Sequence, residues 1–188
     1  DAVCAFYDER KAEAALAEPN PAHVALAELE WFWQETGKGE FLLVTQNVDD
    51  LHERVGSKNL IHMHGLLNSA FCVECGWQGP RHGRLEGNRE CLACERDALR
   101  PDIVLFGEAP RYMRQIEAAL EQCDLFIAIG TSATVYPAAG FIEIAKANGA
   151  QTHRFDIKAT QNSEVFNRCH VGPASQTVSA WVNEFTII

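Results

Sequence analysis

The stretch TQNVDDLHERVGSKNLIHMHG, residues 45–65, gathers amides, carboxylates and three histidines next to short apolar runs. The run FLLV at 41–44 precedes it, and a second run lies near its end, at 60–63. Such short runs are typical of strands buried in a parallel sheet, and ligands of these sheets bind at the carboxyl ends of the strands. The stretch is therefore either an ordinary polar loop or a ligand site, and the rest of the sequence has to separate the two.

Three side chains directly after the first run have the chemistry of such a site. Gln46, Asn47 and Asp49 offer two amides and a carboxylate, which can hydrogen-bond an amide-bearing ring and ribose hydroxyls. A structural alternative is equally open, because Asn47 and Asp49 could instead cap a helix that begins near Asp50. Spacing alone does not separate the two interpretations.

Two histidines of the stretch lie two residues apart, on one face of the expected strand. His64 immediately precedes Gly65, so we expect it to end the strand and to face the ligand. An imidazole has a pKa near neutral pH, which makes His64 a candidate general base. A lone histidine is more often a packed or surface residue, and this alternative stays open.

A quartet of cysteines predicts a metal centre. The pairs Cys72-x-x-Cys75 and Cys91-x-x-Cys94 are separated by fifteen residues, a spacing that fits two-knuckle tetrahedral zinc sites. Four thiolates leave no position for water, so we expect structural rather than catalytic zinc. The surrounding segment 68–100 is rich in glycine and charge and has little periodicity, which indicates a loop-rich zinc-binding module.

Composition excludes several classes of protein. The 188 residues are 47% hydrophobic and carry a formal net charge of −10, which disfavours nucleic-acid binding and suits a lysine-bearing partner or simple solubility. The apolar runs fall short of the roughly 18–20 residues of a membrane span, and the first residues do not resemble a signal peptide. Seven cysteines, an odd number, suit a reducing compartment. We expect a cytoplasmic monomer that binds neither nucleic acid nor membrane.

The remaining pattern alternates strands with helices. Residues 1–37 have helical composition with a break at 18–21. Further strands are expected at 102–108, 124–132 and 151–157, and further helices at 111–123, 137–149 and 173–188. This alternation predicts an α/β fold with a mostly parallel sheet.

The order and spacing of these motifs resemble the sirtuin family of NAD-dependent protein deacylases. The motifs are TQNVDDLHERVG, HMHG, the two cysteine pairs, IVLFGE, GTS and VYPAAGF, and the resemblance runs from residue 1 to about residue 180. It is greatest for bacterial members that remove negatively charged acyl groups such as succinyl and malonyl. The resemblance implies a Rossmann-like NAD-binding domain over 1–67 and 101–188, with a small Cys4 zinc-binding module inserted at 68–100.

The resemblance also implies roles for individual residues. His64 matches the general base, which acts through the ribose hydroxyls of NAD. The residues matched to the nicotinamide and its ribose are Gln46, Asn47 and Asp49, and those matched to the adenosine side are Gly130, Thr131, Ser132 and Asp156. The family usually has Asn in place of Asp156. A carboxylate there would still accept bonds from ribose hydroxyls and would repel a 2′-phosphate, which favours NAD over NADP.

Two further segments match the binding of an acyl-lysine protein or peptide. The segment that pairs with the peptide as an added strand is Val104, Leu105, Phe106, Gly107 and Glu108. Tyr7 and Arg10 form the Tyr-x-x-Arg pair of members that act on succinyl- and malonyl-lysine. The guanidinium fork suits a carboxylate, and the phenol adds a hydroxyl donor.

One departure leaves alternatives open. The family's first strand and its glycine-rich phosphate loop lie before the position that matches residue 1, so this N-terminal segment is absent from the sequence. The implied function is NAD-dependent removal of succinyl, malonyl and acetyl groups from lysine, giving nicotinamide and O-acyl-ADP-ribose. The alternatives are a plain deacetylase and a catalytically silent fragment that only binds acyl-peptide or adenosine.

Overall fold

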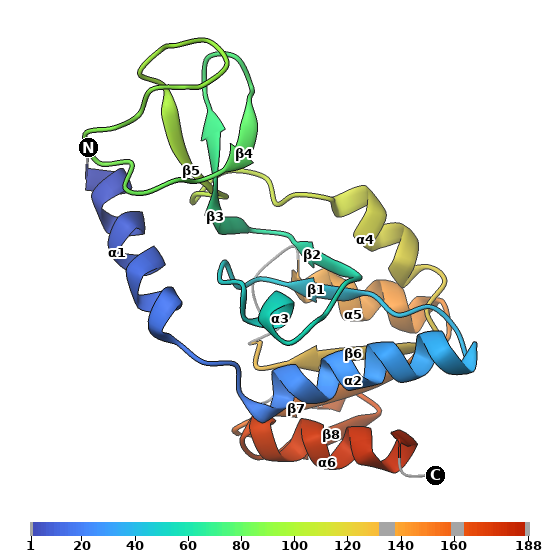
Figure 1. Cartoon of the computed structure of the whole chain (residues 1–188). Helices are drawn as coiled ribbons and strands as arrows, with labels where there is room; N and C mark the ends of the chain where they lie inside the picture. Colours follow the sequence, from blue (N-terminus) through green and yellow to red (C-terminus); the bar gives the residue numbers. More distant parts are fainter. Residues whose placement is uncertain (1, 132–137, 159–163, 187–188) are drawn as a thin grey trace. The chain divides into compact units, whose positions relative to one another are not determined.

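The computed structural model describes residues 2–131, 138–158 and 164–186. Its helices and strands form two compact units (Figure 1). The first unit comprises Asp1–Glu18, Leu43–Arg54 and Leu60–Arg111, and the second comprises Pro19–Leu42, Val55–Asn59 and Tyr112–Ile188. Within the described ranges, no helix is long and apolar enough to cross a membrane.

The first unit holds one helix of several turns and two small sheets. Its elements are α1 (Ala2–Leu16), β1 (Leu43–Thr45), α3 (Leu51–Arg54), β2 (Leu60–His62), β3 (Gly65–Cys72), β4 (Gln78–Pro80) and β5 (Leu99–Ile103). Strands β1 and β2 pair in parallel, with Leu43 opposite Leu60 and Thr45 opposite His62. Their carboxyl ends therefore meet at one edge, as the positions of the polar residues predicted.

The expected loop-rich character of segment 68–100 is wrong in one respect. Strands β4, β3 and β5 form a three-stranded antiparallel sheet in that order. Strand β3 buries Gly65 and Leu67, and then Ala70 and Cys72, because the pairing register shifts between Gly65 and Ala70. This shift interrupts the period-2 alternation, which hid the strand in the sequence.

Strand β5 also differs from the expectation. It spans Leu99–Ile103, whereas the sequence predicted a strand over 102–108. Residues 104–108 instead form a turn in which the N–H of Glu108 donates to the carbonyl of Leu105 over 2.9 Å. The apolar run that suggested a strand is thus divided between the end of β5 and an exposed turn.

The hydrophobic core around the cysteine quartet contains few large side chains. Its buried members are Cys4, Ala70, Cys72, Leu85, Cys91, Ala98 and Leu99. Trp77 and Cys94 pack against this cluster. Cys4 comes from α1, so the helix contributes to the core of the module and lies against β3 and β5 (Figure 1).

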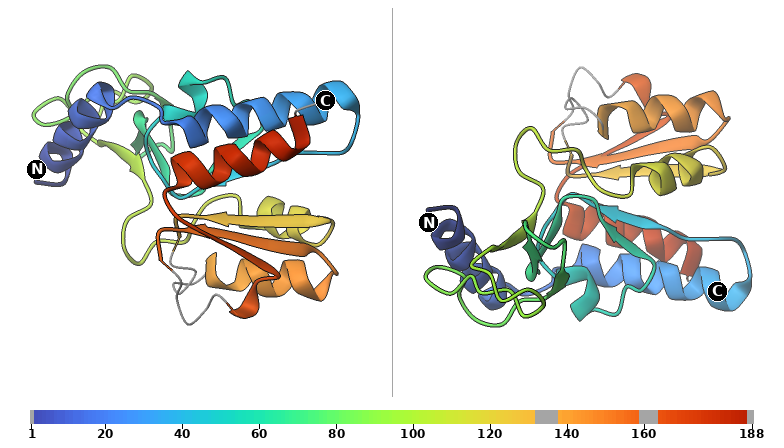
Figure 2. Two further views of the ribbon diagram at one scale, coloured as in Figure 1. Left: turned by 90° about the horizontal axis from the view of Figure 1, so that it is seen from below. Right: turned by 90° about the horizontal axis from the view of Figure 1, so that it is seen from above.

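The second unit is a three-stranded parallel sheet with helices on both faces. Its elements are α2 (Pro21–Thr36), α4 (Met113–Leu120), β6 (Leu125–Ile129), α5 (Ala138–Ala147), β7 (Gln151–Asp156), β8 (Arg168–Val171) and α6 (Ala174–Thr186). The strand order is β6-β7-β8. Helix α5 packs on one face and α6 on the other, with α2 beside α6 (Figure 2). This arrangement confirms the predicted α/β fold; β8 was not predicted.

The break between the first two helices has a clear local cause. Asn20 caps α2, because its Oδ1 accepts the N–H of Ala22 over 2.8 Å and its own N–H donates to Nδ1 of His23 over 3.1 Å. Pro21 occupies the first helical position, where its missing N–H costs nothing. Gly37 ends the helix in the left-handed conformation, with φ of 61°.

Candidate functional site

The ring of His64 lies against the polar loop that follows β1. Its Nδ1 is 3.1 Å from the backbone oxygen of Gln46. A carbonyl oxygen can only accept, so Nδ1 carries a proton, and in the neutral ring the lone pair is therefore on Nε2. This is the tautomer that a general base needs. Strand β2 ends at His62, so His64 belongs to the turn after the strand rather than to the strand itself.

The ring of His62 contacts the next residue of the same loop, Asn47. Its Nδ1 is 3.2 Å from the backbone oxygen of Asn47, and its Nε2 is 2.7 Å from Oε1 of Glu53. Burial opposes the charged ring, but the hydrogen bond and charge of Glu53 outweigh it and raise the pKa of His62. The two rings therefore fix the carbonyls of two consecutive loop residues. Sequence reasoning did not find Glu53, because no local pattern links it to His62.

Asp49 takes the helix-capping role that the sequence left open. Its Oδ1 accepts the N–H of Leu51 over 3.1 Å and so caps α3. Asn47 differs, since its backbone N–H donates to Oγ1 of the buried Thr45 over 3.0 Å and its side chain is exposed. Of the two residues that could cap the helix, Asp49 does so. Asn47 does not, and its side chain is exposed.

Gly65 fixes the backbone immediately after His64. Its φ is +88°, and a Cβ at this position would collide with the backbone carbonyl of Asp102. Only glycine fits this close approach. The carbonyl of His64 also accepts the N–H of Val104 over 2.9 Å, which joins the histidine turn to the segment predicted to pair with peptide.

That segment, 104–108, is an exposed turn closed by Glu108. A carboxylate oxygen of Glu108 accepts the N–H of Leu105 over 2.9 Å, and Arg100 pairs with the same carboxylate at 3.0 Å. The hydrogen bond from Leu105 and the Arg100 guanidinium hold the pKa of Glu108 below its usual range. Phe106 stands fully exposed at the tip, with 110% relative exposure. The turn therefore presents an aromatic side chain to solvent.

The cysteine quartet forms a cluster that fits a metal ion. The sulphur atoms of Cys72, Cys75, Cys91 and Cys94 all lie within 4.8 Å of one another. The Cys72–Cys94 and Cys75–Cys91 sulphur pairs are each 3.7 Å apart. Four sulphurs placed about 2.3 Å from zinc at tetrahedral corners are about 3.8 Å apart, so these distances match a Cys4 zinc site.

The two halves of the cluster repeat one turn. The N–H of Gly76 donates to the carbonyl of Cys72 over 3.0 Å, and the N–H of Glu95 donates to that of Cys91 over 2.8 Å. Both turns need a positive φ at the fifth residue, 74° at Gly76 and 59° at Glu95. Burial favours the neutral thiol of Cys72, but N–H groups of its own turn outweigh this and lower its pKa to about 7, whereas at Cys94 the N–H of Arg96 is outweighed by burial and the neighbouring thiols, which raise the pKa to about 12. A thiolate is the form that binds metal.

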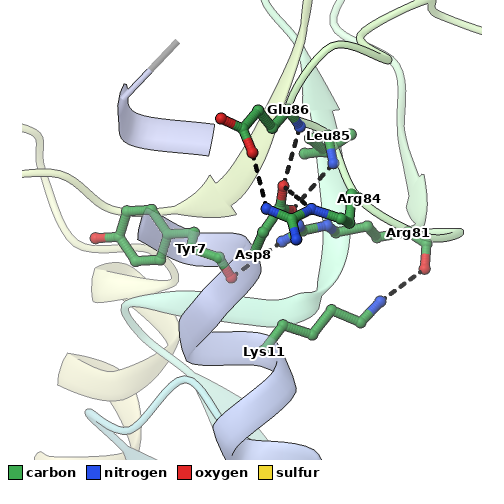
Figure 3. Close-up of polar contacts among 7 residues, drawn as sticks. All are labelled: Tyr7, Asp8, Lys11, Arg81, Arg84, Leu85 and Glu86. Atoms are coloured by element: carbon green, nitrogen blue, oxygen red, sulfur yellow. Dashed lines mark hydrogen bonds and ion pairs between the residues drawn. The ribbon is translucent and has the colours of Figure 1, made fainter. Parts of the chain in front are cut away.

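Tyr7 and Arg10 lie on α1 of the same unit. Tyr7 is half-buried, and its backbone oxygen lies 3.5 Å from a guanidinium nitrogen of Arg81 (Figure 3). Arg10 is exposed; it pairs with Glu13 at 3.1 Å, and its guanidinium lies 5.4 Å from the ring centroid of Phe6. The Arg10 guanidinium, which was predicted to bind the carboxylate of an acyl group, therefore already pairs with the carboxylate of Glu13.

Three of the predicted adenosine residues lie in the second unit, and Ser132 lies outside the described residues. Gly130 follows β6 with φ of +60°, and its N–H donates to the carbonyl of Phe155 over 2.9 Å. Asp156 ends the neighbouring β7 and accepts a bond from Arg154 over 2.6 Å, which lowers its pKa. Arg154 also reaches the carbonyl of Thr131 at 3.5 Å. The carboxyl ends of adjacent parallel strands therefore carry these residues, as ligand sites of α/β sheets do.

The second unit is a parallel α/β sheet of the class that binds ligands at its strand ends, and the first unit carries a Cys4 cluster that fits a zinc ion. A family model described as "Sir2 family" matches residues 2–137, more than half of the chain. The chain belongs to this family, the sirtuins.

Individual relatives agree with this assignment. An NAD-dependent protein deacylase of Caulobacter vibrioides is 48% identical over 178 residues, which cover 94% of this chain and 74% of the relative. The structure of a Sir2 homologue in complex with NAD has a TM-score of 0.85 and 32% identity, and the match covers 96% of this chain and 70% of that one. Sir2Af2 bound to a myristoylated histone peptide has a TM-score of 0.73 and 28% identity, with 97% and 80% coverage.

Proposed function

We propose that this protein uses NAD to remove succinyl, malonyl and also acetyl groups from protein lysine. The observation that carries the proposal is the hydrogen bond of His64 to the carbonyl of Gln46, which leaves Nε2 as a proton acceptor beside the polar loop. The relative from Caulobacter is named an NAD-dependent protein deacylase, which supports the same reaction here. The expected products are nicotinamide and O-acyl-ADP-ribose.

The residues of the chain have distinct tasks in this reaction. When bound, NAD would supply an ADP-ribosyl group to the acyl oxygen of the modified lysine, with nicotinamide as the leaving group. Water would complete the release of lysine and of O-acyl-ADP-ribose. The Nε2 atom of His64 accepts a proton from a ribose hydroxyl. The amides of Gln46 and Asn47 bind the nicotinamide and its ribose, and the free oxygen of the Asp49 carboxylate assists, because its Oδ1 is taken by the cap.

The adenosine side is proposed to lie against the strand ends of the second unit. Gly130 lets the backbone approach the ligand closely, and the hydroxyl of Thr131 offers a hydrogen bond. Asp156 accepts bonds from the ribose hydroxyls and repels a 2′-phosphate, so we expect NAD to be preferred over NADP. Arg154 supports this role, because it holds the carboxylate ionised at the strand end.

Selectivity for acidic acyl groups is assigned to Tyr7 and Arg10. The guanidinium of Arg10 presents the planar fork that binds a carboxylate, and its partner Glu13 is exposed, so an acyl carboxylate can take the place of Glu13. The structure of Sir2Af2 with a myristoylated peptide supports binding of long acyl-lysine side chains within the family. The net charge of −10 suits lysine-bearing protein partners.

The selectivity is tested by nicotinamide release from peptides that differ only in a succinyl, malonyl or acetyl group. Loss of a charge-assisted hydrogen-bond pair is worth about 1.5–3 kcal/mol, so Arg10→Met is expected to lower kcat/KM for the succinyl peptide roughly ten- to hundredfold. Its effect on the acetyl peptide should stay within about twofold. The exposed Arg114 provides a control, since Arg114→Met removes the same charge elsewhere. If Arg10→Met lowers kcat/KM equally for the succinyl and acetyl peptides, the selectivity for acidic acyl groups is refuted and the plain-deacetylase alternative holds.

The role of His64 is tested by His64→Tyr. This change removes the proton acceptor and keeps an aromatic ring at the turn, so turnover of all three peptides should cease while zinc content and thermal unfolding remain those of the unmodified protein. His62→Gln is the matched histidine control, and it should retain measurable turnover. Undiminished nicotinamide release by His64→Tyr would exclude His64 as the base.

A further inference from the structure

A buried carboxylate lies between the two residues assigned to acyl selectivity. Asp8 follows Tyr7 directly on α1, and its side chain is only 1% exposed. Its Oδ1 accepts the N–H of Leu85 and its Oδ2 the N–H of Glu86, each over 3.0 Å (Figure 3). The fully buried guanidinium of Arg81 forms an ion pair with the same carboxylate.

This cluster attaches α1 to the zinc module through buried polar groups. The partners of Asp8 all lie within residues 81–86, between the two cysteine pairs; Arg84 adds a more distant contact at 3.7 Å. Withdrawing the carboxylate would leave a guanidinium buried without its counter-charge, which is strongly unfavourable. The attachment is therefore stiff, and the helix is held at a defined position on the module.

The attachment also fixes the rotation of α1 about its own axis. Cys4, Asp8 and Lys11 are spaced four and three residues apart, so they share one face of the helix. Cys4 is buried in the module core, and Nζ of Lys11 donates to the carbonyl of Arg81 over 3.0 Å. Three contacts on one face, one apolar and two polar, prevent the helix from rolling.

Arg10 lies away from this docked face, whereas Tyr7 borders it, three residues after Cys4 and four before Lys11. With 3.6 residues per turn, Tyr7 is about 100° round the helix from Asp8, and Arg10 is on roughly the opposite side. A roll of about 10° moves a group that lies about 6 Å from the axis by about 1 Å. A displacement of that size in a binding group is enough to cost up to about a hundredfold in rate.

From this geometry we infer that Asp8 is a positioning residue for acyl selectivity, acting through the Tyr7–Arg10 pair. By locking α1 onto residues 81–86 of the zinc module, it sets where the phenol and the guanidinium meet the carboxylate of a succinyl or malonyl group. The inference rests on the proposed function. It adds a role for the first of the two residues between Tyr7 and Arg10, which the motif itself leaves unspecified.

The test compares Asp8→Asn with Glu9→Gln. Both changes remove one negative charge from the same helical turn, but Glu9 is exposed. The readouts are kcat/KM for succinyl- and acetyl-lysine peptides and the Kd of each peptide, measured on the same sample, so any unfolded fraction cancels from the ratio of the two peptides. Asp8→Asn is expected to lower the succinyl-to-acetyl ratio by about tenfold or more, mainly through KM and Kd, and Glu9→Gln to leave it unchanged.

Lys11→Met keeps the inference testable if Asp8→Asn does not fold. It removes the more peripheral contact to the carbonyl of Arg81, and it should lower the same ratio by about two- to threefold with kcat for the acetyl peptide retained. An unchanged ratio in Asp8→Asn, or in Lys11→Met where Asp8→Asn is insoluble, would overturn the inference. Arg10→Met separates the selectivity of the Tyr7–Arg10 pair from the positioning role of Asp8. If Arg10→Met lowers the succinyl-to-acetyl ratio and the Asp8 and Lys11 variants do not, the proposed selectivity stands without the positioning role. If Arg10→Met also leaves the ratio unchanged, both proposals are wrong.

Discussion

Removal of the metal is expected to unfold the zinc module while the second unit stays folded. Among the residues that the structure describes, the buried cluster around the quartet contains two large aliphatic side chains, Leu85 and Leu99. Their burial is worth about 1.5–3 kcal/mol each, or roughly 3–6 kcal/mol together. A structural zinc site contributes about 10–16 kcal/mol of apparent binding free energy, so the metal supplies the larger part of the stability.

Hydrogen exchange with and without a chelator measures this directly. The informative amides are those of Cys72 and Cys91, which donate to the carbonyls of Trp77 and Arg96 over 2.8 Å. Both should lose protection when zinc is removed, and so should the amides of α1, since Cys4 is part of the same core. Amides of the parallel sheet in the second unit should keep their protection.

Two exposed cysteines provide a matched pair of variants. Cys75→Ser removes one of the four ligands and is expected to abolish stoichiometric zinc binding, whereas Cys169→Ser, outside the quartet, should leave the zinc content unchanged. Mass spectrometry under native conditions reports both. Full protection of the Cys72 and Cys91 amides in metal-free protein would refute the reasoning, because the residual core would then suffice on its own.

Three further predictions concern stability. Glu95 adopts φ of 59°, so Glu95→Gly should stabilise the module by roughly 1 kcal/mol and raise the chelator concentration at which it unfolds; an unchanged or lower midpoint would contradict this. The raised pKa of His62 and the lowered pKa of Glu53 mean that their pair stabilises most between pH 4.5 and 6.5, weakening as Glu53 is protonated below that window and as His62 loses its proton above it. Denaturant unfolding of His62→Gln across pH checks this, and an advantage of the unmodified protein that grows above pH 7 would be inconsistent with it. His170 stacks on Phe155 with centroids 4.2 Å apart, and burial lowers its pKa, so stability of the second unit should fall as pH drops below 6.5; His170→Phe should resist acid better, and an identical acid midpoint would exclude this cause.

Short-range patterns predicted most elements because their causes are local. The break between α1 and α2 depends on Asn20 and Pro21, and the end of α2 on Gly37, and all three residues are visible as capping signals. The continuous apolar runs predicted β1 and β6 in the same way. Strand β3 was missed because its pairing register shifts between Gly65 and Ala70. Buried and exposed residues alternate on each side of the shift but not across it, and no local sequence rule anticipates such a shift.

The site was predictable where chain neighbours or regular spacing carried it. The cysteine quartet depends on spacing alone, and the loop at Gln46 and the turn at His64 meet because two parallel strands end side by side. Long-range polar contacts were not predictable. The bond from Leu85 to Asp8 spans 77 positions in the chain, and a single buried acid on a helix has no signature in the sequence.

The most direct test of the assigned reaction is to follow one succinyl-lysine peptide by mass spectrometry, with and without NAD, while nicotinamide is measured in the same sample. The predicted result is one nicotinamide released for each lysine freed, no freed lysine without NAD, and neither product with His64→Tyr. Freed lysine in the absence of NAD, or turnover that survives the loss of His64, would contradict NAD-dependent deacylation through this histidine.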